Sequence, residues 1–322
     1  MDANHSCLVI KPRATDYVKG VNSPIVYKAV SSGNWVPYIE FFERQMLTSG
    51  DTDGCVLFTT QETFDAQIER MIQAGEITLA TLQVFNDLGY LDTGTDGKPH
   101  FHTSPRWIQI LTGNGLNGNS VQQGWDVIRN YGALPYKDLP VDPTMTPQEY
   151  IDPTAITQAM KDKALQFREA MGGRLPDSRD FVQYHWIATG AENLQGMIDA
   201  LLQAPLCLGV NVGTNWNVSA PPAPASGANP GHCVMGFQIT SPDDVHIYDH
   251  YQPNPKELMN YPVWWALQAV VIVNPPVPAP TLPAPATPST ASPSQIAQWL
   301  RSLSAWLSNI ADGLEGKVEK KN

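Results

Sequence analysis

The sequence predicts an α+β fold in which helices come first and an antiparallel sheet follows. Apolar residues recur at helical spacing from Cys55 to about Gln73, and further helical segments follow as far as residue 171. After that point the chain changes to short β-rich runs with a single helix between them. Helices and strands that are segregated along a chain are typical of α+β proteins, whereas alternation is typical of α/β proteins.

Four helices are expected in the first half. They cover residues 55–73, a segment that starts near 78, residues 121–128 and residues 153–171. Ser120 is a good N-cap for the third helix, and Gly132 follows its end. Residues 91–102 contain two Asp/Gly pairs, so this stretch is expected to be rich in turns.

The second half is expected to supply the sheet. The predicted strands cover residues 180–187, 206–212, 233–240, 245–249 and 265–273, with a helix at 192–203. Alternation along the strand that follows His232 puts this residue and Cys233 on opposite faces. Cys233 is therefore expected to lie in the core.

Composition excludes several classes of function. The 322 residues are 42% apolar and 16% charged, as in an ordinary globular protein. A net charge of −11 without any Lys/Arg cluster argues against a nucleic-acid partner. No apolar stretch approaches the length of a membrane span, and residues 1–7 do not resemble a signal peptide, so we expect a cytoplasmic or virion-associated location.

The chain has four cysteines, Cys7, Cys55, Cys207 and Cys233. Their spacing favours free thiols over disulfides. Without a Cys-x-x-Cys pair or paired histidines, a zinc site is not expected, and we expect neither a metal nor another cofactor.

The sequence divides into four regions. Residues 1–32 form an N-terminal arm, 33–274 the main domain, 275–293 a Pro/Ala-rich linker, and 294–322 an amphipathic helix with a polar tail. Eight apolar residues share one face of that helix. We expect residues 294–316 to dock on a protein partner or on a second copy of the chain, while folding back on the main domain is the alternative.

Three residues have the types and order of a thiol catalytic site. Cys55 starts a helix, His232 lies on a later strand, and Asp249 ends the next strand. A helix N-terminus and a nearby imidazolium both favour the nucleophilic thiolate. A third polar group has to hold the imidazole in the correct orientation, and Asp249 is the candidate.

Four segments resemble papain-like cysteine peptidases of the type found in bacteria and their phages. They are Gly54–Thr59 at the nucleophile helix, 114–128 at the glycine-rich wall of the cleft and its helix, 130–140 at the turn after that helix, and Gly231–Phe237 at the base strand. The resemblance implies a papain-like fold of two subdomains, one helical and one β-rich, and Asn117 and Gly118 in the substrate cleft.

The sequence departs from the family pattern at three places, and the first is Val56, where the family usually has Trp. Asp249-His250-Tyr251 stands where the family usually has Asn-Ser-Trp, and Tyr251 is expected to shield the His–Asp bond and to line the cleft. The family's oxyanion-hole Gln precedes Cys by six residues, but that position is Ser49 here. An insertion at 48–53 would restore Gln45 to the oxyanion hole.

These observations predict a thiol hydrolase that cleaves peptide or related amide bonds through Cys55, His232 and Asp249. The expected substrate is a peptide or a protein. The alternative is a structural or virion-associated assembly protein on a papain-like scaffold, with weak or lost catalysis. Thiol reactivity discriminates between the two, because a catalytic Cys55 alkylates faster at low pH than the other cysteines do.

Overall fold

The computed structural model describes Cys7 and residues 17–18, 29–173, 182–187, 194–210, 231–241, 244–257 and 263–272. The chain separates into two compact units, Met1–Pro275 and Pro276–Asn322, and every described residue belongs to the first. The predicted linker and the predicted helix at 294–316 therefore lie outside the described residues. Within the described ranges, no helix is both long enough and apolar enough to cross a membrane.

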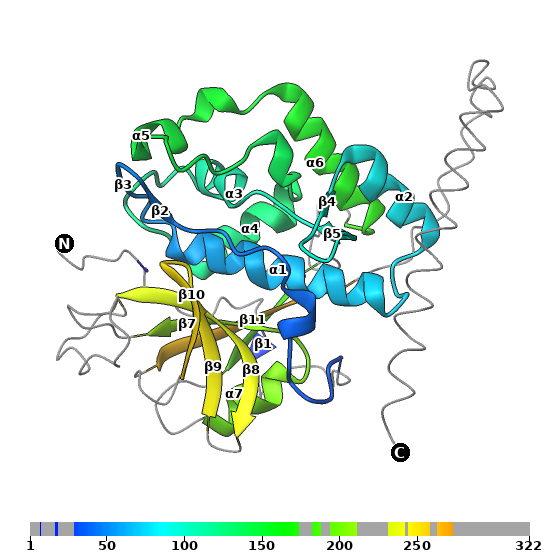
Figure 1. The fold of residues 1–322 in the computed structure, drawn as a ribbon, viewed down its shortest axis with the longest axis vertical. Helices are drawn as coiled ribbons and strands as arrows, with labels where there is room; N and C mark the ends of the chain where they lie inside the picture. The colour runs from blue at the N-terminus through cyan, green and yellow to red at the C-terminus, as the bar shows by residue number, and fades with distance from the viewer. Residues whose placement is uncertain are drawn as a thin grey trace. The chain divides into compact units, whose positions relative to one another are not determined.

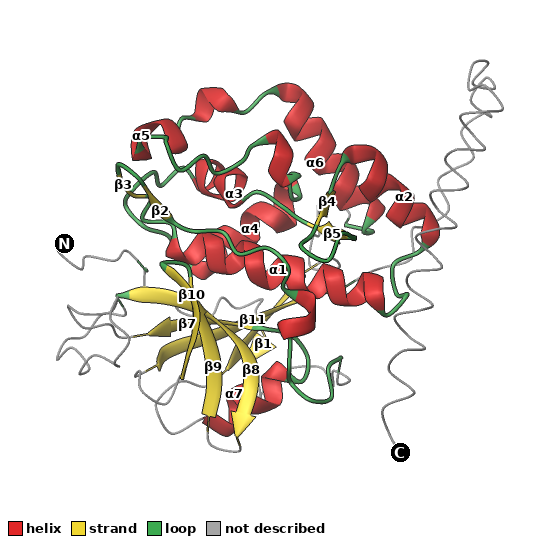
Figure 2. Ribbon diagram, in the orientation of Figure 1, coloured by secondary structure: helices red, strands yellow, loops and turns green. Residues whose placement is uncertain are grey.

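Helices make up most of the chain between residues 55 and 170 (Figures 1 and 2). The α-helices here are α1 (Cys55–Gln73), α2 (Leu79–Leu88), α3 (Pro105–Thr112), α4 (Val121–Tyr131), α5 (Pro147–Tyr150) and α6 (Gln158–Ala170). Three 3₁₀ turns, η1 (Val36–Tyr38), η2 (Tyr136–Asp138) and η3 (Pro153–Ala155), accompany them. Two small hairpins join β2 (Met46–Leu47) to β3 (Gly50–Asp51) and β4 (Leu91–Thr93) to β5 (Pro99–Phe101).

The β half is a seven-stranded sheet with the order β1-β6-β11-β7-β8-β9-β10. Its strands are β1 (Tyr17–Val18), β6 (Val182–Ile187), β7 (Leu206–Val210), β8 (His232–Ser241), β9 (Asp244–Asp249), β10 (Gln252–Glu257) and β11 (Val263–Val271). All neighbours pair antiparallel except β1 and β6. This arrangement confirms the α+β class with a helical half and an antiparallel β half.

Helix α1 joins the two halves. It begins and ends at the predicted residues, Cys55 and Gln73, and its side chains are buried from Cys55 to Met71. One side of α1 contacts α3 and α4, and the other contacts β7, β8 and β11. Figure 1 shows α1 lying between the helical layer and the sheet. Because a helix buried all round is held by packing, its position relative to β8 is well defined.

The predicted third helix, α4, has both of its end signals. Ser120 and Gln123 form a reciprocal capping box at its start. Gly132 ends it with φ +84°, and a Cβ at this position would lie 2.0 Å from the backbone oxygen of Ala164 in α6. Only glycine fits there, so the turn after α4 packs directly on the backbone of α6.

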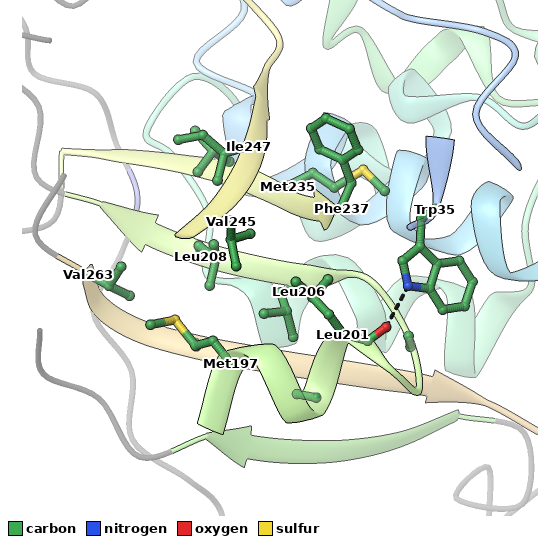
Figure 3. Close-up of a cluster of buried hydrophobic side chains, with 14 of the residues drawn as sticks. Trp35, Met197, Leu201, Leu206, Leu208, Met235, Phe237, Val245, Ile247 and Val263 are labelled. Atoms are coloured by element: carbon green, nitrogen blue, oxygen red, sulfur yellow. Dashed lines mark hydrogen bonds between the residues drawn. The ribbon is translucent and has the colours of Figure 1, made fainter. Parts of the chain in front are cut away.

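An apolar core fills the space between the sheet and α7 (Leu194–Leu201), as Figure 3 shows. Leu206, Leu208 and Val245 lie in this core and are fully buried. Burial of each such side chain stabilises the fold by about 1.5–3 kcal/mol. The indole N–H of Trp35 donates to the backbone oxygen of Leu201 (2.7 Å). This hydrogen bond holds the segment around Trp35 against the last residue of α7.

The structure differs from the sequence prediction in several elements. The turn-rich stretch 91–102 contains the short β4–β5 hairpin. Helix α6 begins at Gln158, five residues later than predicted, because Thr157 caps it. Helix α3 and strand β10 were not predicted.

Candidate active site

Cys55 is the first residue of α1, and Gly54 is its N-cap. A Cβ at Gly54 would lie 2.4 Å from the side-chain oxygen of Gln109, so a larger residue there would require the Gln109 side chain to move. The Cys55 sulfur accepts hydrogen bonds from the backbone N–H groups of Cys233 and Val56. Cys233 directly follows His232, so the start of α1 meets the start of β8 at the sulfur of Cys55.

The Cys55 thiol is enclosed, with 1% of the residue exposed. Burial raises the pKa of the Cys55 thiol well above its usual value, and the nearby Cys233 thiol and Asp51 carboxylate raise it further. The two backbone N–H groups act in the opposite direction. In this enclosed arrangement the neutral thiol is therefore the favoured form.

His232 and Asp249 form a buried pair. Nε2 of His232 lies 2.9 Å from Oδ1 of Asp249, and both residues are 0% exposed. The two strands carry them in antiparallel register, with Met235 of β8 opposite Tyr248 of β9. This register puts His232 and Asp249 on the same face of the sheet, one step apart along the diagonal.

Tyr251 covers this pair. Its ring stacks on the His232 ring with centroids 5.1 Å apart and planes at 26°. Its backbone N–H donates to Oδ1 of Asp249 (3.1 Å), and its hydroxyl donates to Oδ2 of Asp51. Burial and the Asp51 carboxylate raise the pKa of Tyr251, so the hydroxyl remains a donor. The predicted aromatic shield is thus present in the geometry.

The segment 46–51 folds into the β2–β3 hairpin, with Met46 opposite Asp51. The two residues that flank the hairpin, Gln45 and Thr52, therefore lie side by side. The Thr52 N–H donates to the backbone oxygen of Gln45 (3.3 Å). Gln45 therefore lies beside the turn that leads into Cys55. Asp53 in that turn has φ +51°, an unusual value for a residue with a side chain, and its N–H donates to Oδ1 of Asp51 (2.9 Å).

Gln45 is buried next to the His–Asp pair, while Ser49 is not. The backbone N–H of Gln45 donates to the backbone oxygen of His250 (3.1 Å), and its amide Nε2 donates to Oδ1 of Asp51 (3.0 Å). Ser49 is exposed and donates to the backbone oxygen of Met145 (2.8 Å). Gln45 thus contacts Asp51 and His250, whereas Ser49 contacts Met145.

The glycine-rich loop 114–119 is held by its own side chains. Asn114 donates to the backbone oxygen of Gly118 (3.1 Å), and Asn117 donates back to the backbone oxygen of Asn114 (2.8 Å). Gly118 is buried with φ +75°, whereas Asn117 is exposed. Asn117 is therefore the outer residue of this wall, and Gly118 is an inner one.

Cys7 of the N-terminal arm reaches this wall. It forms an isolated parallel bridge with Asn119 and is 5% exposed. Asn119 itself is fully buried. The backbone of the wall can therefore pair with an extended segment of chain, as peptide-binding edges do.

All four cysteines are buried and free. The Cys7 and Cys233 thiols are hydrogen-bonded, and Cys55 and Cys207 lie close enough to raise the pKa of Cys7, although burial is the larger cause. The prediction of free thiols agrees with this arrangement. Cys233 lies in the core as expected, but it also touches the candidate nucleophile.

Sequence reasoning missed two residues of the site, Asp51 and Cys7. Asp51 binds Gln45 and Tyr251 together, although 200 residues separate it from the tyrosine. The sequence does indicate a turn at Asp51, because an aspartate often accepts a hydrogen bond from the backbone N–H two residues later, here that of Asp53. It gives no indication that Asp51 also contacts Tyr251. Cys7 carries no local signal beyond being a cysteine.

No protein-family model and no curated protein matches the chain. Several solved structures do. Xylellain, a cysteine protease from Xylella fastidiosa, is 14% identical and has a TM-score of 0.44, with 83% of this chain and 100% of xylellain covered. The proform of the ragweed pollen cysteine protease Amb a 11 is 11% identical and has a TM-score of 0.46. The match covers 77% of this chain and 68% of the Amb a 11 chain. Procathepsin L 3 of the Tenebrio molitor larval midgut is 12% identical and has a TM-score of 0.46. The match covers 84% of this chain and 77% of the procathepsin chain.

The described part of the chain has the two-subdomain α+β architecture that its sequence predicts. It has the helical half, the antiparallel β half and the central helix that starts with the candidate nucleophile. The solved structures named above are distant, so they assign no activity, substrate or residue role to this chain.

Proposed function

We propose that the chain is a thiol hydrolase that cleaves peptide or related amide bonds, with Cys55 as nucleophile, His232 as base and Asp249 as orienting residue. The observation that carries the proposal is the buried His232–Asp249 pair on β8 and β9, next to the point where β8 meets the Cys55 sulfur. A buried imidazole–carboxylate pair beside a thiol at a helix start combines the parts that activate a sulfur nucleophile.

The chemistry follows from the placement of the ring nitrogens. Nε2 of His232 is paired with Asp249, so Nδ1 is the nitrogen that exchanges a proton with Cys55. The sulfur attacks the substrate carbonyl carbon as its proton passes to Nδ1. That proton then goes to the leaving amine, a thioester forms, and water deprotonated by the same nitrogen releases the acid. Tyr251 keeps water away from the His232–Asp249 bond.

Gln45 and the Cys55 backbone N–H are the proposed donors to the developing oxyanion. The Gln45 amide has two N–H bonds, of which Asp51 takes one and the oxyanion would take the other. Asp51 therefore fixes the amide and leaves one donor available. We expect Asn117, Gly118 and Tyr251 to line the substrate cleft, with the loop wall pairing with the substrate backbone.

Replacement of Gln45 by Ala should lower kcat/KM by about 100–1,000-fold, because one oxyanion donor is lost. The effect should be on kcat, which steady-state kinetics with a fluorogenic peptide measures. Ser49→Ala is the matched control and should leave kcat unchanged, because Ser49 donates to Met145 outside the site. A large loss in the Ser49 variant with none in the Gln45 variant would reverse the assignment.

The enclosed Cys55 has to become accessible for this chemistry. Cys7 lies against the loop wall at Asn119 and against the thiols at the site. We therefore expect the N-terminal arm to limit access. A deletion of residues 1–16 removes Cys7 and retains Tyr17 and Val18, which pair with β6.

Alkylation of the four cysteines tests the proposal. In the full chain, iodoacetamide at about pH 6 should modify Cys55 slowly, because it is buried. Without residues 1–16, the Cys55 rate should rise at least about tenfold and exceed the rates of Cys207 and Cys233, measured by peptide mass spectrometry. The Cys7→Ser variant of the full chain loses the Cys7 thiol but keeps the arm. Its Cys55 alkylation rate therefore shows whether the thiol or the whole arm limits access. Equal slow rates at Cys55 and Cys207 in every variant would contradict a nucleophilic Cys55.

A second function is favoured by one observation. The Cys55 thiol is buried, and its pKa is raised by burial and by the Cys233 and Asp51 side chains. A structural or virion-associated assembly protein on the same scaffold would keep this arrangement permanently. Docking of residues 294–316 on a partner or a second copy stays a prediction of the sequence, because those residues lie outside the described part of the chain.

A further inference from the structure

A small cavity lies beside α1, away from the candidate active site. It has room for about one water-sized group (≈ 10 Å³) and lies under residues 38–41. Its charged lining consists of four carboxyl groups and one imidazole: Glu40, Glu62, Asp65, Glu69 and His100. Four acidic side chains and one imidazole thus surround a space of the size of one water molecule.

Three of the four carboxyl groups are already held by donors. Asp65 accepts from the backbone N–H and the hydroxyl of Thr103 (2.9 and 2.6 Å). Glu40 accepts from the Thr95 hydroxyl (2.6 Å). Glu69 accepts from the backbone N–H of Phe101 (3.0 Å). The protein itself therefore supplies hydrogen-bond donors to these three carboxyl groups.

His100 does not supply a charge to the remaining carboxyl. Its Nδ1 lies 3.1 Å from Glu69 and its Nε2 lies 3.0 Å from Asp96. The hydrogen bond with Glu69, helped by Asp96, raises the pKa of His100 to about 9, so the ring is a cation that these two partners share. Both ring nitrogens are occupied, and His100 has no donor left for Glu62.

Glu62 is the exception in this lining. It is 3% exposed, and its Oε2 is buried with no hydrogen-bond partner among the described residues. The neighbouring Gln61 has a buried and unpartnered Oε1, while its Nε2 donates to Asp65 (2.5 Å). Two acceptors without donors thus lie beside a cavity of the size of one small group.

A buried carboxylate without a partner is unstable unless it takes up a proton or a cation. Burial raises the pKa of Glu62 well above its usual range, and the Asp65 and Glu43 carboxylates raise it further. A bound cation removes this cost, since it compensates the charge and supplies donors to Glu62 and Gln61 together.

We propose that the Glu62 cavity binds a primary ammonium group, either the free ammonium ion or the terminal ammonium of a lysine side chain or alkylamine. An ammonium group donates three or four hydrogen bonds to separate oxygen acceptors, as Glu62 and Gln61 offer, and it matches a water molecule in size. Among the described residues, no three His, Cys, Asp or Glu side chains are grouped as a metal ion requires, which favours a hydrogen-bonding cation over a coordinated metal.

The thermal midpoint of the full chain tests this at about pH 8, where ordinary carboxyl groups are ionised. Ammonium chloride should raise Tm by about 2–4 °C over choline chloride at equal ionic strength, because choline is too large for the cavity. Glu62→Gln should abolish this increment, because the amide carries no negative charge to hold the cation. Glu169→Gln, at an exposed acidic residue of α6, is the matched control and should keep the increment.

Two further salts distinguish the sources of the ammonium group. n-Butylammonium mimics a lysine side chain, and an increment equal to that of ammonium supports a lysine or alkylamine as the ligand. An increment with ammonium alone supports the free ion. Equal increments with potassium chloride would overturn the assignment in favour of a monatomic cation. Absence of any increment, or an undiminished increment in Glu62→Gln, would show that the cavity holds no ammonium group.

Discussion

Cys55→Ser is expected to lower the turnover of a peptide amide by at least about 10⁴-fold in the chain lacking residues 1–16. Loss of the nucleophile in a triad removes most of the catalysis and leaves only what binding and the oxyanion donors supply. The hydroxyl is a much weaker nucleophile than the thiolate, although it occupies nearly the same space. Turnover of a fluorogenic peptide, with KM measured separately, checks the result.

Cys207→Ser is the matched control for that experiment. Cys207 is also a buried free thiol, and its sulfur contacts the Thr63 hydroxyl at 3.5 Å. A serine there keeps a polar contact with Thr63, so activity should fall less than about threefold. Similar losses in both variants would mean that the cysteines matter for packing and not for chemistry.

Asp249→Ala is expected to lower both turnover and stability. The substitution leaves His232 buried without its 2.9 Å partner, and a buried polar group that loses its partner costs about 1–3 kcal/mol. Turnover should fall at least about 100-fold, because the imidazole loses the group that fixes its tautomer and orientation. Denaturant unfolding and peptide hydrolysis measure the two effects separately.

Asp249→Asn distinguishes orientation from charge. An amide oxygen can still accept from Nε2 of His232 and from the Tyr251 backbone N–H, so this variant should keep most of the turnover that Ala loses. Asp199→Ala, at an exposed carboxylate of α7, should change neither property. If Asp249→Ala destabilised the fold without changing kcat per folded molecule, Asp249 would be a structural residue only.

Elements with strong local signals could be predicted from the sequence. The bounds of α1 followed from apolar periodicity, and the start of α4 followed from its N-cap, Ser120. The His232–Asp249 pairing followed from strand order, because residues at the ends of adjacent antiparallel strands meet. Helix α3 carries readable signals too, Ser104-Pro105 at its start and Gly113 after its end, but its eight residues are too few for periodicity to establish it.

The remaining parts of the site depend on contacts between distant segments. The hairpin that brings Gln45 beside Thr52 could be inferred only as an insertion, and its geometry comes from the pairing of β2 with β3. The Asp51–Tyr251 bond and the approach of Cys7 to Asn119 join segments more than 100 residues apart. Tertiary packing decides such contacts, and neither propensity nor spacing encodes them locally.

The distance between Cys55 Sγ and the nearest His232 ring nitrogen, measured in a crystal structure of the full chain, tests the central claim most directly. The account predicts that Nδ1 is the nearer nitrogen and that it lies within about 4 Å of the sulfur, allowing for looser contacts without substrate. A separation of more than about 6 Å, or a ring turned so that Nδ1 faces away from Cys55, would contradict a catalytic Cys55–His232 pair.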